Sequence, residues 1–556
     1  MIRTVTFLLF VLLIQPVFAI QVPSNLDFEA LRTIPVLDNG RHKPFDTFAG
    51  ESIRKITGKW KYEGNSPSAL VLSMLTSHDW LHEQCIRIDY MPLKEALGFD
   101  VNQQFFNYHA ITDNPHFREL ANRTFQKHSS QQELNPLETE MGELIHKLNL
   151  LHALITGEAV KIVPPPPGSP DEADWLPIAD PQGYSAETQT ELRNMFSTVT
   201  AAFTTADNAQ FQQAVQNLKA KLSTLNPEAY QYAHHLELEI FYNDSRPFLY
   251  SWVLYLIAFL IFLTWYSFPN KPLWWSGYGF AIAGFLLHSY GLIVRAIISG
   301  RAPVSNMYES VIWVGWGIVA TAIIFDLLYR RHWFMTTASA LGVGFLILAD
   351  ILPFDPNIEP LVPVLRSNYW LIIHVLTITL SYSIFALGMA LAHVILAIYF
   401  YMPKRRDLLS ELSLFLYRII QVGVVFLFAG TVLGGVWAAE SWGRFWGWDP
   451  KETWALISLI GYLAILHARY TGWMRDFGTA VCSILGFWLI LMTWYGVNFV
   501  LAVGLHSYGF GSGGGTYVMG YLLAEVLFLT GVALKYKTMN ATVNAAINAD
   551  ETESLA

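Results

Sequence analysis

Residues 371–400 read LIIHVLTITLSYSIFALGMALAHVILAIYF and contain no Asp, Glu, Lys or Arg. An α-helix rises about 1.5 Å per residue, so about 20 apolar residues cross the hydrocarbon core of a bilayer. The stretch exceeds that length without one charged side chain. It therefore predicts a transmembrane helix.

Apolar runs of this kind recur along the chain from Pro247 onward. Hydrophobic residues make up 53% of the sequence and charged residues 14%, which is typical of a protein with a large part inside a membrane. We predict an all-α polytopic membrane protein with nine transmembrane helices. They cover residues 248–266, 277–298, 308–328, 334–352, 370–400, 412–437, 453–470, 477–501 and 517–536.

The chain before these runs has a different character. Residues 1–20 carry one arginine, an apolar core and the small-residue ending Val17-Phe18-Ala19, the pattern of a secretory signal peptide or N-terminal anchor. Residues 21–246 are more polar, and stretches such as QTELRNMFSTVTAAF place apolar residues three to four positions apart. We expect a mostly helical extracytoplasmic domain there, followed by a membrane domain over residues 247–540.

Basic residues mark one side of the predicted membrane domain. Lys and Arg cluster after alternate helices, and such clusters are typical of cytoplasmic loops. The signal peptide and the clusters independently predict one topology, with the N-terminal domain and the loop 438–452 outside and a cytoplasmic tail at 541–556. The clusters lie at residues 330–331, 404–406, 469–475 and 535–537.

Charge and cysteine content exclude several classes of protein. The net charge of −9 provides no basic field for a phosphate backbone, so nucleic acid is not an expected partner. The only cysteines, Cys85 and Cys482, form no CxxC motif, so neither a thiol oxidoreductase nor a thiolate zinc site is expected.

The loop 438–452, AAESWGRFWGWDPKE, carries the candidate chemistry. Trp442, Trp446 and Trp448 are separated by glycines and followed by Asp449. An interfacial aromatic belt explains single tryptophans, but not this glycine-spaced cluster. Flat indoles can form a broad apolar platform for a planar ligand, and a porphyrin is the obvious one. Its propionates would need cationic partners, for which the same loop offers Arg444 and Lys451.

The segment WGRFWGWDPKE closely resembles the WWD signature of the haem-handling superfamily that includes CcsA (ResC), CcmC and CcmF. The resemblance to CcsA covers most of residues 247–540, including SGRAPVSNMYES at 299–310. The stretch IPVLDNGRHKPFDTFA at 34–49 resembles the segment before the CcsA part in fused CcsB–CcsA synthases. The resemblance implies a bacterial inner-membrane protein of system II cytochrome c biogenesis, with haem b as its ligand.

The resemblance also implies a set of haem ligands. Family members carry two outer histidines flanking the WWD segment, and His374 and His506 match them; both lie near the predicted outer face. His467 matches a further histidine, inside the helix after the WWD loop. The second ligand at that inner site comes from the CcsB part in fused synthases, so a CcsB (ResB)-type partner is implied. His288 and His393 are the alternatives within this chain.

We therefore expect a cytochrome c assembly protein, part of a holocytochrome c synthase, that presents haem to CxxCH apocytochromes. The alternatives are a haem carrier of the CcmC type, delivering haem to another lyase, and a solute transporter with tryptophan belts. The expected haem-binding residues are His374, His506, His467, Trp442, Trp446, Trp448, Asp449 and Arg444, with the three histidines as iron ligands.

Overall fold

The computed structural model describes residues 22–554 apart from 131, 171–172, 231–232, 353, 362–366, 502–503, 505 and 507–513. The expected signal peptide or anchor at residues 1–20 lies outside these described residues. The chain divides into two compact units, Met1–Asn243 and Asp244–Ala556, here called the first and the second unit.

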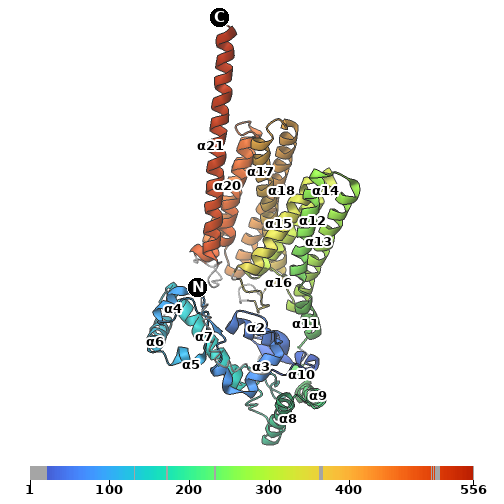
Figure 1. The fold of residues 1–556 in the computed structure, drawn as a ribbon, viewed down its shortest axis with the longest axis vertical. Coiled ribbons are helices and arrows are strands. Elements are labelled where there is room, and N and C mark those ends of the chain that lie inside the picture. Colours follow the sequence, from blue (N-terminus) through green and yellow to red (C-terminus); the bar gives the residue numbers. More distant parts are fainter. Residues whose placement is uncertain are drawn as a thin grey trace, which may run out of the picture. The chain divides into compact units, whose positions relative to one another are not determined.

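The first unit is mostly helical, as expected (Figure 1), and it also contains two small antiparallel sheets. Its elements are α1 (Glu29–Arg32), β1 (Pro35–Asp38), β2 (Arg41–Pro44), α2 (Phe45–Thr57), α3 (Pro67–Thr76), η1 (His78–Leu81), β3 (Ile86–Arg87), α4 (Met91–Ala96), β4 (Phe105–Phe106), α5 (Tyr108–Thr112), α6 (Pro115–Ser129), α7 (Pro136–Thr156), α8 (Ala186–Thr204), α9 (Asn208–Leu225), α10 (Pro227–Tyr230) and α11 (Leu236–Ser245), whose last residues enter the second unit.

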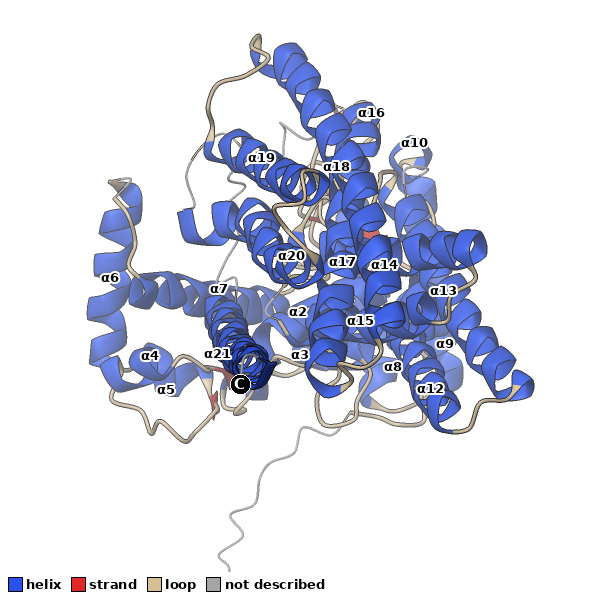
Figure 2. Cartoon of the chain, turned by 90° about the horizontal axis from the view of Figure 1, so that it is seen from above, coloured by secondary structure: helices blue, strands red, loops and turns tan. Residues whose placement is uncertain are grey.

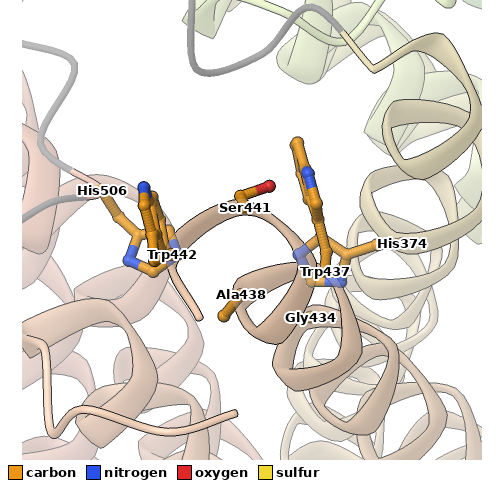
Figure 3. Close-up of a pocket in the computed structure, with 7 residues that line it drawn as sticks. All are labelled: His374, Gly434, Trp437, Ala438, Ser441, Trp442 and His506. Carbon is orange, nitrogen blue, oxygen red and sulfur yellow. The ribbon is translucent and has the colours of Figure 1, made fainter. Parts of the chain in front are cut away.

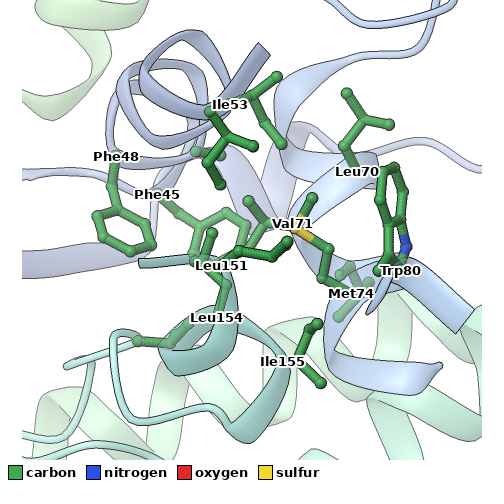
Figure 4. Packing of buried hydrophobic residues seen from close by; sticks show 14 of the residues in the cluster. Phe45, Phe48, Ile53, Leu70, Val71, Met74, Trp80, Leu151, Leu154 and Ile155 are labelled. Atoms are coloured by element: carbon green, nitrogen blue, oxygen red, sulfur yellow. The ribbon is translucent and has the colours of Figure 1, made fainter. Parts of the chain in front are cut away.

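One hydrophobic core holds the first unit together. Figure 4 shows Phe45 and Ile53 of α2, Val71 of α3 and Leu151 of α7 packed against one another. These side chains are almost wholly buried, and each contributes about 1.5–3 kcal/mol by leaving water. This burial explains why a domain of short helices needs no disulfide.

The segment 34–49 forms a β-hairpin that leads into α2. Asn39 and Gly40 both have positive φ, 50° and 75°, as a two-residue type I′ turn requires. Asp38 therefore pairs with Arg41 across the hairpin.

The second unit is a helical bundle. Figure 2 shows α17 in its interior, and α17 packs against α14, α18 and α20. The elements are α12 (Pro247–Ser267), α13 (Lys271–Ser299), α14 (Met307–Tyr329), α15 (Trp333–Ile351), α16 (Asn368–Trp370), η3 (Leu371–Val375), α17 (Leu376–Tyr401), α18 (Arg406–Trp442), α19 (Pro450–Tyr470), α20 (Asp476–Leu491), η4 (Met492–Leu501) and α21 (Gly515–Ser554).

Helices that could cross a membrane dominate this unit, in agreement with the predicted polytopic all-α fold. Among the described residues, eight are long and apolar enough to do so. They are Leu236–Ser267, Lys271–Ser299, Met307–Tyr329, Trp333–Ile351, Leu371–Tyr401, Arg406–Trp442, Asp476–Leu501 and Gly515–Met539.

The ninth predicted range, 453–470, is helical as α19 but is not among those eight. Lys451 and Glu452 in its first turn and His467 and Arg469 in its last turn make it less apolar than the others. The helix itself was predicted correctly, whereas the count of strongly apolar helices is lower by one than expected.

Two segments of the bundle, η3 and η4, are π-helical. A π turn holds one more residue than an α turn and is common at functional sites. Segment η3 contains His374, and η4 lies directly before the stretch that contains His506. Both irregular segments therefore adjoin the expected outer ligands.

Candidate functional site

A cavity of about 1160 Å³, including space open to solvent, lies within the second unit. It is lined by α14, η3, α17, α18, α19, η4 and His506. A narrower cavity of about 270 Å³ has His374, Trp437 and His506 in common with it (Figure 3).

His374 reaches this cavity from η3. Its Nδ1 lies 2.8 Å from the carbonyl oxygen of Gly430 on α18. A carbonyl oxygen only accepts hydrogen bonds, so Nδ1 carries the proton and Nε2 keeps its lone pair. Trp437 packs edge-on against the imidazole, with ring centroids 5.7 Å apart. The side chain is thus fixed in tautomer and orientation.

His506 is held in a similar way. Its Nδ1 lies 3.0 Å from Oδ1 of Asp449, and the indole of Trp442 stands perpendicular to the imidazole at 4.8 Å. Donation from Nδ1 to the carboxylate again leaves Nε2 with a free lone pair. Figure 3 shows His506 and His374 at opposite sides of the pocket, with the end of α18 between them.

Two imidazoles with anchored Nδ1 atoms form a typical metal-ligand arrangement, in which a second group orients each ligating histidine. Among the described residues, no group of three or more His, Cys, Asp or Glu side chains could hold a metal ion by itself. Two imidazole donors on opposite sides of the pocket fit a metal that brings its own equatorial ligands. Haem iron is such a metal, and its axial positions accept two histidines.

The loop between α18 and α19 owes its shape to a capping box. Asp449 is the N-cap of α19, where Oδ1 accepts a hydrogen bond from the backbone nitrogen of Lys451 at 2.9 Å. Oε2 of Glu452 accepts from the backbone nitrogens of Gly447 at 2.7 Å and Asp449 at 3.2 Å. Asp449 therefore shapes the loop and orients His506 at once.

The tryptophans of this loop separate into two groups. Trp442 lines the narrow cavity and Trp446 the larger one. Trp448 has a positive φ of 58° and is 69% exposed, so the expected three-membered platform has two members at the cavity. Trp437 and Trp494, which the sequence reasoning did not select, complete the aromatic wall. Trp437 could have been selected from the sequence because it lies five residues before Trp442 on the same helix, α18.

The two cations of the loop also differ. Arg444 lies 3.5 Å from Glu452 and 5.7 Å from the ring of Trp442, and it does not line the cavity. Lys451 does line the cavity, and its Nζ donates to Oδ1 of Asn498 at 3.1 Å. Burial lowers the pKa of Lys451 to about 8, although the charge of Asp449 raises it in part. Lys451 is thus the loop cation that faces the cavity.

The remaining candidate histidines lie elsewhere. His467 is exposed in the last turn of α19 and does not line either cavity. His288 is buried, with Nε2 3.0 Å from the carbonyl of Ile312 and Nδ1 3.4 Å from the hydroxyl of Tyr255. Both nitrogens of His393 also have partners. The structure therefore brings together only the outer pair.

A buried ion-pair network fixes the wall beside the first turn of α14. Glu309 accepts from Nε of Arg295 at 2.8 Å and from Nη1 of Arg301 at 2.9 Å. The same arginines also donate to the carbonyls of Pro356, Asn357 and Glu359. The network connects two loops, which accounts for these buried charges without a ligand.

Comparison with known proteins finds relatives for this part of the chain. The family model described as "Cytochrome C assembly protein" matches residues 304–506, the part that holds the cavity. "Protein NrfI" of Wolinella succinogenes is 32% identical over 504 residues, covering 85% of this chain and 53% of NrfI. The chain thus spans about half the length of that relative.

Shorter relatives match the second unit more completely. "Cytochrome c biogenesis protein CcsA" of Guillardia theta is 36% identical over 266 residues, which cover 43% of this chain and 87% of that protein. The protein of the same name from Prochlorococcus marinus subsp. pastoris is 36% identical over 249 residues, covering 39% of this chain and 78% of the relative.

Proposed function

The chain belongs to the cytochrome c assembly protein family, with relatives of the CcsA and NrfI type, and on that premise we propose how it handles haem. We propose that haem b binds between His374 and His506 and is presented to the two thiols of a CxxCH apocytochrome. One observation carries the proposal: each imidazole has its Nδ1 anchored and its Nε2 free at one cavity.

The other lining residues support a porphyrin in that space. Trp437, Trp446 and Trp494 supply aromatic surface for a planar ring. Lys451 and Asn498 supply the cation and the amide that propionates would need. Of the two cations first considered, Lys451 is the better placed, because Arg444 is paired with Glu452.

The protein acts in this proposal by positioning. Bound haem supplies the vinyl groups to which cysteine thiols add, with sulfur and hydrogen both retained in the product. The residues of the cavity hold the ring still, occupy both axial positions and exclude water from its apolar face. No side chain of the site needs to act as a general acid or base.

A partner completes the proposed system. His467 is exposed on α19, a position from which it could share an intramembrane ligand role with a helix of a CcsB (ResB)-type subunit. We place the assembly in a bacterial inner membrane, with the loop 438–452 outside, where apocytochromes are found. The WWD resemblance and the relation to CcmC belong to this proposal as well.

A reporter cytochrome with one CxxCH motif tests the proposal. It is expressed with this chain and a CcsB-type subunit in cells without their own assembly system, and covalent haem is detected after denaturation. The chain should yield haem-stained reporter, and His374→Gly or His506→Gly should abolish most of it. His116→Asn, a change at an exposed histidine of α6 in the first unit, is the control with near-normal yield.

The alternatives predict other results. A haem carrier of the CcmC type would hold haem but yield labelled reporter only with a further lyase present. A solute transporter would bind no haem, and the proposed function would then be wrong.

A further inference from the structure

Two titratable side chains face each other inside the second unit, away from the cavity. Nε2 of His393 on α17 lies 3.1 Å from Oε2 of Glu525 on α21, and its Nδ1 lies 2.9 Å from the carbonyl oxygen of Met389. Glu525 is 7% exposed. Ionisable groups at membrane depth are costly and usually serve a purpose.

These hydrogen bonds fix how many protons the pair holds. The carbonyl of Met389 only accepts, so Nδ1 of His393 carries one proton. The contact between Nε2 and the carboxyl oxygen needs a second proton, which belongs either to the imidazole or to the carboxyl group. In both cases the pair as a whole is neutral, the form that an apolar environment tolerates.

The pair lies in the stripe by which α21 meets its neighbours. The hydroxyl of Tyr521 lies 3.2 Å from the sulfur of Met389, and the ring of Phe528 packs against His393 at 5.0 Å. Further along α21, Tyr536 stacks on Phe477 at 4.1 Å. Many other apolar side chains of α21 are exposed, so these contacts mark the face by which the helix packs on its neighbours.

The two helices joined here are next to the outer histidines in sequence. His374 lies in η3, which runs directly into α17, and α21 is the first helix after His506. We propose that the hydrogen bond between His393 and Glu525, here called the clasp, holds α21 against α17 and thereby sets the position of His506 opposite His374. Both are positioning residues that do not touch haem, and their link to haem rests on the proposed function.

Hydrogen-bond energetics make the clasp testable. Replacing one partner by Leu removes the hydrogen bond between the two helices and leaves the other side chain without that partner inside the membrane, whereas replacing both removes the bond without leaving an unmatched side chain. Glu525→Gln is conservative, because its amide can donate to Nε2 while Nδ1 keeps its own proton. The single Leu, double Leu and Glu525→Gln variants should therefore differ from one another if the hydrogen bond docks α21, and should behave alike if it does not.

The first experiment measures docking without haem. Tyr399→Cys on α17 and Tyr536→Cys on α21, whose rings lie 6.1 Å apart, are introduced into the full chain with Cys85 and Cys482 replaced by Ala, and a short bismaleimide links them in native membranes. His393→Leu or Glu525→Leu should lower the cross-linking yield about threefold or more. This factor corresponds to the free energy of a typical interhelical hydrogen bond in a membrane. Glu525→Gln should retain the parental yield, and the yield of the double Leu variant should lie between those of the parental chain and the single Leu variants.

Two results would overturn the clasp. One is that all four variants keep the parental cross-linking yield. The other is that Glu525→Gln lowers the cross-linking yield as much as Glu525→Leu does. Either shows that the shared hydrogen bond does not dock α21.

The second experiment reads the haem spectrum of the same variants with native cysteines. The single Leu variants should convert part of the six-coordinate haem to five-coordinate haem, and Glu525→Gln should restore it. An unchanged spectrum despite lost cross-linking overturns the link to His506. If cross-linking follows the expected pattern while no form binds haem, the clasp stands and the proposed function fails.

Discussion

His374 and His506 differ in the group that holds Nδ1. A neutral carbonyl, that of Gly430, accepts from His374, whereas the carboxylate of Asp449 accepts from His506. A carboxylate makes an imidazole a stronger electron donor than a carbonyl does. We therefore expect His506 to be the stronger axial ligand and His374 the one more readily replaced by the histidine of a CxxCH segment.

The place of His374 depends on a glycine. A Cβ added at Gly434 would lie 2.6 Å from Cε1 of His374, closer than such contacts allow. Gly434→Ala should push the imidazole aside and leave mostly five-coordinate haem, measured by optical spectroscopy. Gly344→Ala is the control, since its added Cβ meets nothing within 4 Å. Equal spectra of the two variants would show that His374 is not a ligand in this geometry.

Lys451 gives the site a pH dependence. Because burial lowers its pKa to about 8, its charge is present below that pH and lost as the pH rises through it. The haem affinity should fall about tenfold between about pH 7 and about pH 9. A tenfold change corresponds to the free energy of one charge-assisted hydrogen bond. Lys451→Arg should remove this step in a titration, since arginine stays charged. If the Lys451→Arg variant shows the same fall in haem affinity with pH, another group causes the pH dependence.

Sequence reasoning selected part of this site and missed the rest for a physical reason. Trp442, Trp446 and Asp449 stood out because they are crowded into one short loop. Trp437 and Trp494 did not, because an aromatic residue near the end of an apolar helix is ordinary and its rotation toward the cavity is set by helix packing. Trp448 shows the converse, since the backbone turn at this residue directs it away from the cavity.

At the scale of single elements, the π-helical segment η3 sets the rotation of His374 relative to α17. Val375 is the last residue of η3, so its deletion should convert the π turn to an α turn and change the direction in which His374 points relative to α17. The variant should lose six-coordinate haem. Val375→Ala keeps the register and should retain it. If the deletion variant keeps the parental spectrum, η3 does not set the orientation of His374.

Helix α19 shows what hydropathy can and cannot predict. The range 453–470 was recognised because its middle is apolar, and the observed helix has 21 residues, about 31 Å of length, enough to cross a bilayer. Its charged ends are explained by the capping box and by Arg469, which pairs with Asp476 at 2.6 Å. Helical packing supports a crossing too, because Tyr462 stacks on Phe385 of α17 at 3.7 Å.

At the scale of the whole molecule, the topology depends on whether α19 crosses. With α19 as a ninth crossing, the loop 438–452 is outside and the C-terminal tail is inside. A membrane-impermeant maleimide should then label Ser441→Cys in intact cells and Ala556→Cys only after permeabilisation. The native chain is the control, because burial raises the pKa of Cys85 to about 12 and so suppresses its reaction. Labelling of both engineered positions from outside would contradict the predicted topology.

The division into a polar helical unit and a membrane bundle followed from hydropathy, which reports burial averaged over many residues. The β-hairpin at 35–44 was not predicted, although its Asn39-Gly40 turn is a recognised hairpin signal. The contact between His393 and Glu525 could not be predicted at all, because it joins helices far apart in sequence. Pairing across a bundle depends on helix rotation and tilt, which one sequence does not encode locally.

In the proposed site His374 and His506 bind one haem between them, and the optical spectrum of the purified chain reports whether they do. The chain should carry low-spin six-coordinate haem. His374→Gly and His506→Gly should each give five-coordinate haem, and added imidazole should restore part of the six-coordinate spectrum by filling the vacated space. If both variants keep the parental spectrum, or if the chain purified from haem-replete cells carries no haem, the account is wrong.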